Sequence, residues 1–126
     1  MHRSQLAGFI IDCQTDDLDQ AANFWSRALG YPAARSGNTE DAHYVGLITA
    51  SNDLCIEVQS VDHPSRVHLD IEADDVEAEV TRLERLGARR IKQIRAWWVM
   101  EAPTGHRFCV IRPQHADFAS ESNCWE

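Results

Sequence analysis

One pattern, a strand followed by a capped helix, occurs twice in the chain, and this repeat restricts the fold more than any other feature. The first helical segment, residues 16–30, opens on two aspartates, carries its apolar residues on one stripe and ends at a glycine. Residues 74–87 repeat these features. Each segment follows an apolar strand, 6–13 or 66–73, and precedes sequence that is typical of three further strands. The pattern therefore predicts the unit βαβββ twice.

Polar turns separate the remaining strands. We expect these strands at residues 33–35, 43–49 and 54–59 in the first unit, and at residues 88–94, 96–101 and 107–112 in the second. A helix on the apolar face of each sheet leaves the other face uncovered, so the two units should pair around a concavity. The predicted fold is α+β, with units 5–60 and 65–113 paired into an open, incomplete barrel within a single domain. The tail, residues 114–126, should pack over a sheet edge or against another subunit.

The polar side of the second helix is expected to face solvent. Asp74 is the predicted N-cap, with Glu77 three residues on, as in a capping box. The charged residues that follow have the spacing of helical ion pairs. They are Glu79, Arg82, Glu84 and Arg85.

Composition restricts the partners and the compartment. Twelve Lys and Arg against twenty Asp and Glu give a formal charge of −8, which argues against nucleic acid and anionic membranes as partners. Residues 1–5 lead into a strand without the apolar stretch of a signal peptide, and no segment approaches the length of a membrane span. We therefore expect a cytoplasmic protein that binds a small molecule. The cysteines lack CxxC spacing and are expected to be packed thiols in a reducing compartment. They are Cys13, Cys55, Cys109 and Cys124.

The strand over residues 66–73 carries the most distinctive polar side chains. Alternation places His68, Asp70 and Glu72 on one face and the apolar residues on the other, which we expect to be dry. The apolar residues are Val67, Leu69 and Ile71. By the offset of the repeat, Asp12 corresponds to Asp70. The two halves are therefore predicted to present a pseudo-symmetric pair of carboxylates to one cavity.

Two features near the end of the chain add candidates to this cavity. Trp97 and Trp98 point to opposite faces of their strand, so one of them should offer a platform for a flat or apolar ligand. We expect Trp98 there, together with Met100, and the other tryptophan in the core. Arg107 lies two residues from Cys109 on the same face and is the one feature that could give this thiol an electropositive setting.

Three segments, in this order around the repeat, resemble the vicinal oxygen chelate superfamily. They are FWSRALG at 24–30, HLDI at 68–71 and APTGHRFCV at 102–110. That superfamily includes glyoxalase I, extradiol dioxygenases, and fosfomycin and bleomycin resistance proteins, and the chain is most similar to its small glyoxalase-like branch. The resemblance covers roughly residues 5–115. It implies a divalent metal held by side chains from the first and last strands of each unit.

The metal-ligand positions implied by the resemblance are only partly filled. The opening histidine of the second unit matches His68, and the acidic position on the last strand of the first unit matches Glu57. The first unit's opening position falls on Gly8 or Ile10, which cannot bind metal. The remaining position, a glutamate in metal-binding members, falls on Cys109. His68 and Glu57 are the expected ligands, for zinc, nickel, manganese or iron.

A third ligand has two candidates among the remaining residues. Cys109 as a thiolate would favour a softer metal such as zinc. Asp12 is the other candidate, since it lies on the same strand face as Gly8 and Ile10. If no metal is bound, hydrogen bonds would hold His68 inside a polar cavity.

Two functional hypotheses remain open. In the first, the protein is a glyoxalase-type lyase or isomerase in which Glu57 moves a proton next to a carbonyl or hydroxyl polarised by His68, with or without a metal. In the second, it is a metal-free binding protein similar to bleomycin resistance proteins, which sequesters a flat or cationic compound. A homodimer is expected in either case. The predicted substrate-binding residues are Asp12, Asp70, Trp98, Arg107 and Cys109.

Overall fold

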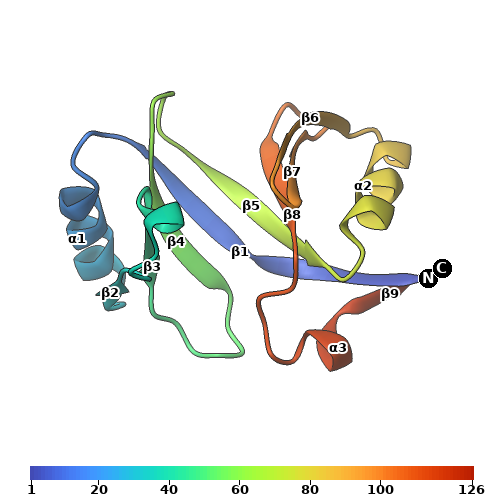
Figure 1. Ribbon diagram of the computed structural model, residues 1–126, viewed down its shortest axis with the longest axis horizontal. Helices are drawn as coiled ribbons and strands as arrows, with labels where there is room; N and C mark the ends of the chain where they lie inside the picture. Colours follow the sequence, from blue (N-terminus) through green and yellow to red (C-terminus); the bar gives the residue numbers. More distant parts are fainter. The chain divides into compact units, whose positions relative to one another are not determined.

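The structure is a computed structural model that describes residues 1–126, with only the backbone of Glu40 described. The first half of the chain forms β1 (His2–Gln14), α1 (Leu18–Leu29), β2 (Ala33–Ala34), a 3₁₀ turn (Thr39–Asp41), β3 (Tyr44–Leu47) and β4 (Cys55–Val61). The second half forms β5 (Arg66–Ala73), α2 (Val76–Arg85), β6 (Arg89–Ile94), β7 (Trp97–Glu101), β8 (Arg107–Ile111), α3 (Phe118–Glu121) and β9 (Asn123–Trp125). This order confirms the βαβββ repeat and the α+β class (Figure 1).

The chain forms two compact units. The N-terminal unit contains residues 9–67, and the C-terminal unit contains residues 1–8 together with residues 68–126. The start of β1 therefore belongs with the second repeat, where His2, Arg3 and Ser4 pair with the tail strand β9. Among the described residues, no helix has the length and apolar composition needed to cross a membrane.

In the N-terminal unit, α1 covers one face of the sheet. Asp17 caps the helix by accepting a hydrogen bond from the backbone N–H of Gln20 at 3.0 Å, and Gly30 ends it in the left-handed conformation, as predicted. The core lies between helix and sheet, and it contains Ile11, Leu18, Ala22, Val45, Leu47, Ile56 and Val58. Because Ile11 and Ile56 face this core, alternation places Asp12 and Glu57 on the sheet face away from α1.

In the C-terminal unit, α2 covers a sheet whose strand order is β5-β8-β7-β6. The core beneath the helix contains Ala73, Val80, Met100, Phe108 and Val110. Strand β5 pairs with β8 in parallel, and β8 pairs with β7 in an antiparallel ladder. The side chains that alternate with the core residues therefore lie on the face away from α2.

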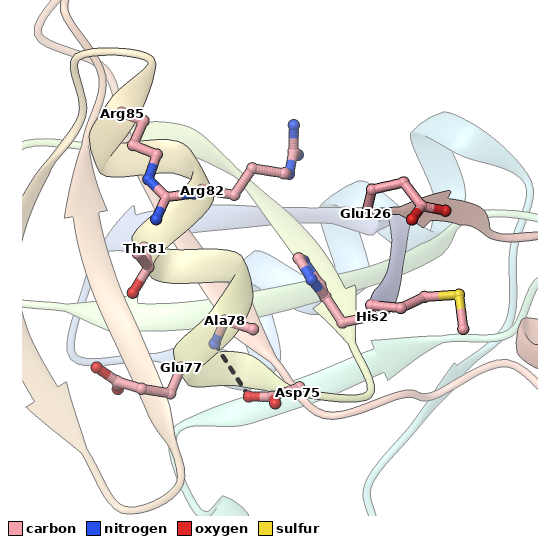
Figure 2. Close-up of a pocket in the computed structure, with 9 residues that line it drawn as sticks. His2, Asp75, Glu77, Ala78, Thr81, Arg82, Arg85 and Glu126 are labelled. Carbon is pink, nitrogen blue, oxygen red and sulfur yellow. Dashed lines mark hydrogen bonds between the residues drawn. The ribbon is translucent and has the colours of Figure 1, made fainter.

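The helix α2 begins one residue later than predicted. Asp75, not Asp74, is the N-cap, and its carboxylate accepts a hydrogen bond from the backbone N–H of Ala78 at 3.0 Å (Figure 2). The carboxylate of Asp74 instead accepts a hydrogen bond from the backbone N–H of Arg3 at 2.8 Å. Either of the two adjacent aspartates could cap the helix as far as the sequence shows. Which one does so depends on β1, about seventy residues away, because Arg3 on that strand binds Asp74.

The apolar face of β5 is dry only near its end. Ile71 and Ala73 pack with the core beneath α2, as expected. Val67 and Leu69 on the same face are 58% and 50% exposed, so the expectation that they are buried is wrong. Alternation identifies a shared face, but the covering helix reaches only the second half of this strand.

Glu79 on α2 is fully buried, which corrects the expectation of a solvated helix face. Its carboxylate accepts hydrogen bonds from Ser4 Oγ at 2.7 Å and from Arg82 Nε at 2.8 Å, and it lies 2.8 Å from His2 Nε2. The Trp125 indole donates to Ser4 Oγ at 2.8 Å, and the Arg82 guanidinium lies 3.8 Å from the centre of the Trp125 ring. Both ends of the chain are thereby attached to α2.

A groove of about 370 Å³ lies beside this cluster, between α2 and the two termini. In Figure 2, the Arg82 side chain extends from α2 towards the side on which His2 and Glu126 lie. The lining of the groove mixes cations with carboxylates and contains none of the predicted site residues. The groove therefore offers no support for the chemistry predicted from the sequence.

The acid stability of the protein should depend on Glu79. Burial by itself raises the pKa of this carboxyl, but hydrogen bonds from Arg82, His2 and Ser4 outweigh burial and lower the pKa. A group with a lowered folded-state pKa stabilises the fold above its unfolded-state pKa and loses that contribution as the pH falls through the folded-state value. Below about pH 5, the unfolding free energy of the wild type should therefore fall more steeply than that of Glu79→Gln, which does not titrate. Urea unfolding at several pH values measures both slopes, and parallel slopes would contradict this assignment.

Candidate functional site

Three potential metal ligands meet on the face of the C-terminal unit that lies away from α2. His68 and Asp70 are two residues apart on β5, and the parallel register places Asp70 directly beside Cys109 on β8. The ligating atoms of the three side chains all lie within 4.8 Å of one another. An imidazole, a carboxylate and a thiol at this spacing form a candidate metal centre.

The surroundings of the Asp70 carboxylate indicate that this centre suits a cation. Its Oδ1 is buried and accepts no hydrogen bond from any described residue, although it lies 3.4 Å from His68 Nε2. Leaving a buried acceptor without a donor costs about 1–3 kcal/mol, more for a charged group. A cation at this position would supply the missing interaction, and the nitrogen, oxygen and sulfur donor set suits zinc. The three residues therefore fit a divalent metal of this kind.

The structure brings together only some of the residues predicted from the sequence. His68, Asp70 and Cys109 form one group, which contains Cys109, one of the two candidates for a third ligand, and Asp70, which was predicted only to bind substrate. Glu57 lies half-buried on β4 of the N-terminal unit, opposite Gly46.

Asp12 also belongs to the N-terminal unit. It is 2% exposed, and its Oδ2 lies 3.9 Å from Arg66 Nε. Asp12 and Asp70 each lie on the sheet face away from the helix of their own unit, as the repeat predicts.

Trp98 does not lie on the face that carries the candidate centre, so its predicted placement is wrong. It packs against the core beneath α2, on the same side as Met100, and the Arg90 guanidinium lies 5.0 Å from the centre of its ring. Trp97 alternates with Trp98 and therefore shares the face of Val99, which lies opposite Cys109 in the antiparallel register. The sequence shows that the two tryptophans oppose each other, but only the register decides which one faces the core.

Arg107 lies on the same face as Cys109, as predicted, and forms part of a small ion-pair network. Its Nε donates to Glu101 Oε2 at 3.2 Å, and Glu101 also binds the Arg89 guanidinium. The hydrogen bond from Arg89, together with attraction to Arg107, lowers the pKa of Glu101. Glu101 therefore stays ionised and holds both guanidinium groups.

Glu72 and His115 were not predicted as functional residues. Glu72 follows Asp70 on the same face of β5 and is fully buried. It accepts hydrogen bonds from Gln5 Nε2 at 2.7 Å and from the backbone N–H of Gln114 at 2.8 Å, and it lies 3.0 Å from His115 Nδ1. The sequence of the tail shows no periodicity from which the contacts of Gln114 and His115 with Glu72 could be predicted.

Solved structures with the same fold have low sequence identity to the chain. Methylmalonyl-CoA epimerase from Mycobacterium tuberculosis has a TM-score of 0.63 at 16% identity, with 91% of each chain covered. A hypothetical protein from Bacillus halodurans also has a TM-score of 0.63, at 10% identity, with coverage of 89% of this chain and 96% of that one. A methylmalonyl-CoA epimerase bound to methylmalonyl-CoA and NH4+ has a TM-score of 0.56 at 13% identity, covering 92% and 97% of the two chains.

Comparison of the sequence with family models gives a match over most of the chain. No curated protein matches the sequence. The model described as a glyoxalase-like domain matches residues 8–111, which include both repeats. The chain therefore belongs to the glyoxalase-like domain family of the vicinal oxygen chelate superfamily.

Proposed function

We propose that the protein is a metal-dependent isomerase or lyase that acts on a small carbonyl or hydroxyl compound at His68, Asp70 and Cys109. The observation that carries this proposal is the buried Asp70 Oδ1, which accepts no hydrogen bond from any described residue and lies within reach of two further ligands. The fold likeness to methylmalonyl-CoA epimerase favours an isomerase over a lyase.

Each residue of the centre has a separate role in this proposal. A bound zinc-type ion would supply Lewis-acid polarisation of a substrate oxygen. His68 would bind through a neutral imidazole, while Asp70 and Cys109 would contribute two negative charges that offset the charge of the ion. Val99, opposite Cys109 in the sheet, would give the substrate an apolar wall. Isomerisation also needs a base that moves a proton, and the sequence hypothesis assigns this role to Glu57.

Elemental analysis of protein purified without chelator tests the proposal. We expect the wild type to carry one zinc ion per chain, and Asp70→Asn and Cys109→Ser to carry less than about a tenth of that amount, because each removes one of three protein ligands. Cys124→Ser is the matched control, since Cys124 is an exposed thiol outside the centre, and it should retain the metal.

Two results would overturn the metal centre. One is a wild type that stays free of metal after incubation with zinc, and the other is an Asp70→Asn variant with wild-type zinc content. Either result would favour the alternative hypothesis, a metal-free binding protein similar to bleomycin resistance proteins. The homodimeric state and the cytoplasmic location stay predictions from the sequence.

A further inference from the structure

The cations of this acidic protein are concentrated in one stretch of the C-terminal unit. Eight of the twelve Lys and Arg residues lie between residues 82 and 112, although the formal charge of the chain is −8. They are Arg82, Arg85, Arg89, Arg90, Lys92, Arg95, Arg107 and Arg112. The same stretch contains only two acidic residues, Glu84 and Glu101. A local excess of cations in an otherwise acidic chain suggests a site for an anion.

The strand register places three of these cations on the face that carries the candidate metal centre. Cys109 lies opposite Val99, and Val99 lies opposite Lys92 on the next strand. Two residues after Val99 on β7, Glu101 lies between Arg107 on β8 and Arg89 on β6. Directly opposed residues in an antiparallel pair point to the same side, with Cβ atoms about 5 Å apart. The cations are therefore neighbours of the centre across the sheet.

Two of these cations have donors to offer a ligand. Glu101 accepts a hydrogen bond from Arg107 Nε. The terminal NH₂ groups of Arg107 form no hydrogen bond with any residue that the structure describes, although the side chain is only 34% exposed. Lys92 is exposed and has no ion-pair partner among the described side chains. A guanidinium held along one edge presents its other edge as a fork, which matches the geometry of a carboxylate or phosphate.

We infer that the substrate of the centre carries an oxyanion group, a carboxylate or a phosphate, which Arg107 and Lys92 bind while the reacting oxygen faces His68, Asp70 and Cys109. This inference rests on the proposed function. The ligand set would neutralise a divalent ion. The three cations Arg89, Lys92 and Arg107 outnumber the two remaining carboxylates, Glu72 and Glu101, so this face keeps a net positive charge. Glu101 is a positioning residue, since it holds the Arg107 guanidinium without contacting the anion.

Anion titration of the zinc-loaded protein tests this inference. Inorganic phosphate and malonate are the two probes, added at constant ionic strength, and the side-chain Nε–H signal of Arg107 in NMR spectra reports binding at that residue. We expect at least one probe to shift the signal and to bind about tenfold more weakly to Arg107→Met, with a smaller loss in Lys92→Met. The preferred probe distinguishes phosphate from carboxylate recognition. The wild type and Arg107→Met both carry zinc, so any binding of a probe to the metal itself contributes equally to the two titrations.

The variants also separate this inference from the proposed function. Arg112→Met removes an exposed cation just beyond β8 and should bind the probes within about twofold of the wild type. Arg107→Lys keeps the charge but loses the fork, and Glu101→Gln loosens the guanidinium, so both should lie between the wild type and Arg107→Met. Equal affinity in the wild type and Arg107→Met, with zinc retained in both, would overturn the anion site alone. Loss of zinc from the wild type would instead overturn the metal centre.

Discussion

Replacing Glu79 by alanine should lower the free energy of unfolding by about 3–5 kcal/mol, the usual range when one partner of a buried charged pair is removed. The expectation follows from the contacts of the carboxylate, which is fully buried and accepts hydrogen bonds from Ser4 and Arg82 while lying within hydrogen-bond distance of His2. Alanine would leave those groups without an acceptor and would open a cavity beneath α2. Both termini depend on the same contacts, so their attachment should weaken together.

Chemical denaturation measures this loss, and Glu77→Ala is the matched control. Glu77 lies two residues earlier on α2, but its side chain is 65% exposed and pairs with Arg90 at the surface. An exposed ion pair contributes about 0–1 kcal/mol, so the control should unfold close to the wild type. Glu79→Gln should lie between the two, because an amide oxygen can still accept hydrogen bonds. Equal unfolding free energies for Glu79→Ala and Glu77→Ala would show that the burial of Glu79 adds nothing to stability.

Replacing Glu72 by alanine should release the tail from the C-terminal unit and lower the free energy of unfolding by about 3 kcal/mol. Glu72 is fully buried and is contacted by Gln5 on β1 and by Gln114 and His115 at the start of the tail. Without the carboxylate, the backbone N–H of Gln114 and the imidazole lose their buried acceptor. The first effect should be local, because Glu72 contacts only the start of the tail. Its end is held separately by the pairing of β9 with β1 and by the contacts of Trp125 with Ser4 and Arg82.

Hydrogen exchange followed by mass spectrometry locates this effect. In Glu72→Ala, the amides of residues 114–121 should exchange much faster than in the wild type, while the amides of β7, β8 and β9 should keep most of their protection. Glu121→Ala is the control, since Glu121 is an exposed carboxylate on α3. Unchanged exchange across the tail would show that Glu72 does not hold it. Glu72→Gln keeps an acceptor and should restore much of the protection.

Much of the fold follows from local patterns that the sequence displays directly. The two helices have caps, apolar stripes and terminal glycines, which are interactions within a few residues of the chain, and the predicted helices and strands are present. Alternation also identified the shared face of His68 and Asp70, because the side-chain period of a strand is fixed by its backbone. The sequence therefore predicted the strand on which the candidate centre lies and the face of that strand.

Partners that come from distant segments were not predictable in the same way. The position of Asp70 beside Cys109 depends on the parallel register of β5 and β8, and the placement of Trp98 depends on which face of β7 meets α2. Both depend on elements that are distant in the sequence, and a shift of the strand register by one residue would move every side chain of that strand to the other face.

The sequence by itself determined the repeated βαβββ order, the family and the strand that carries His68, because these depend on short-range patterns and on motifs in a known order. Only the tertiary structure decided that Asp70 and Cys109 join His68, that Glu79 and Glu72 are buried, and that Arg107 and Lys92 lie on the face of the candidate centre. The physical reason is that the burial of a charged side chain depends on donors brought from elsewhere in the chain. Apart from Arg82, which donates to Glu79 from the same helix, the groups that contact Glu79 and Glu72 lie in the first five residues and in the tail, where the sequence shows no periodicity that predicts these contacts.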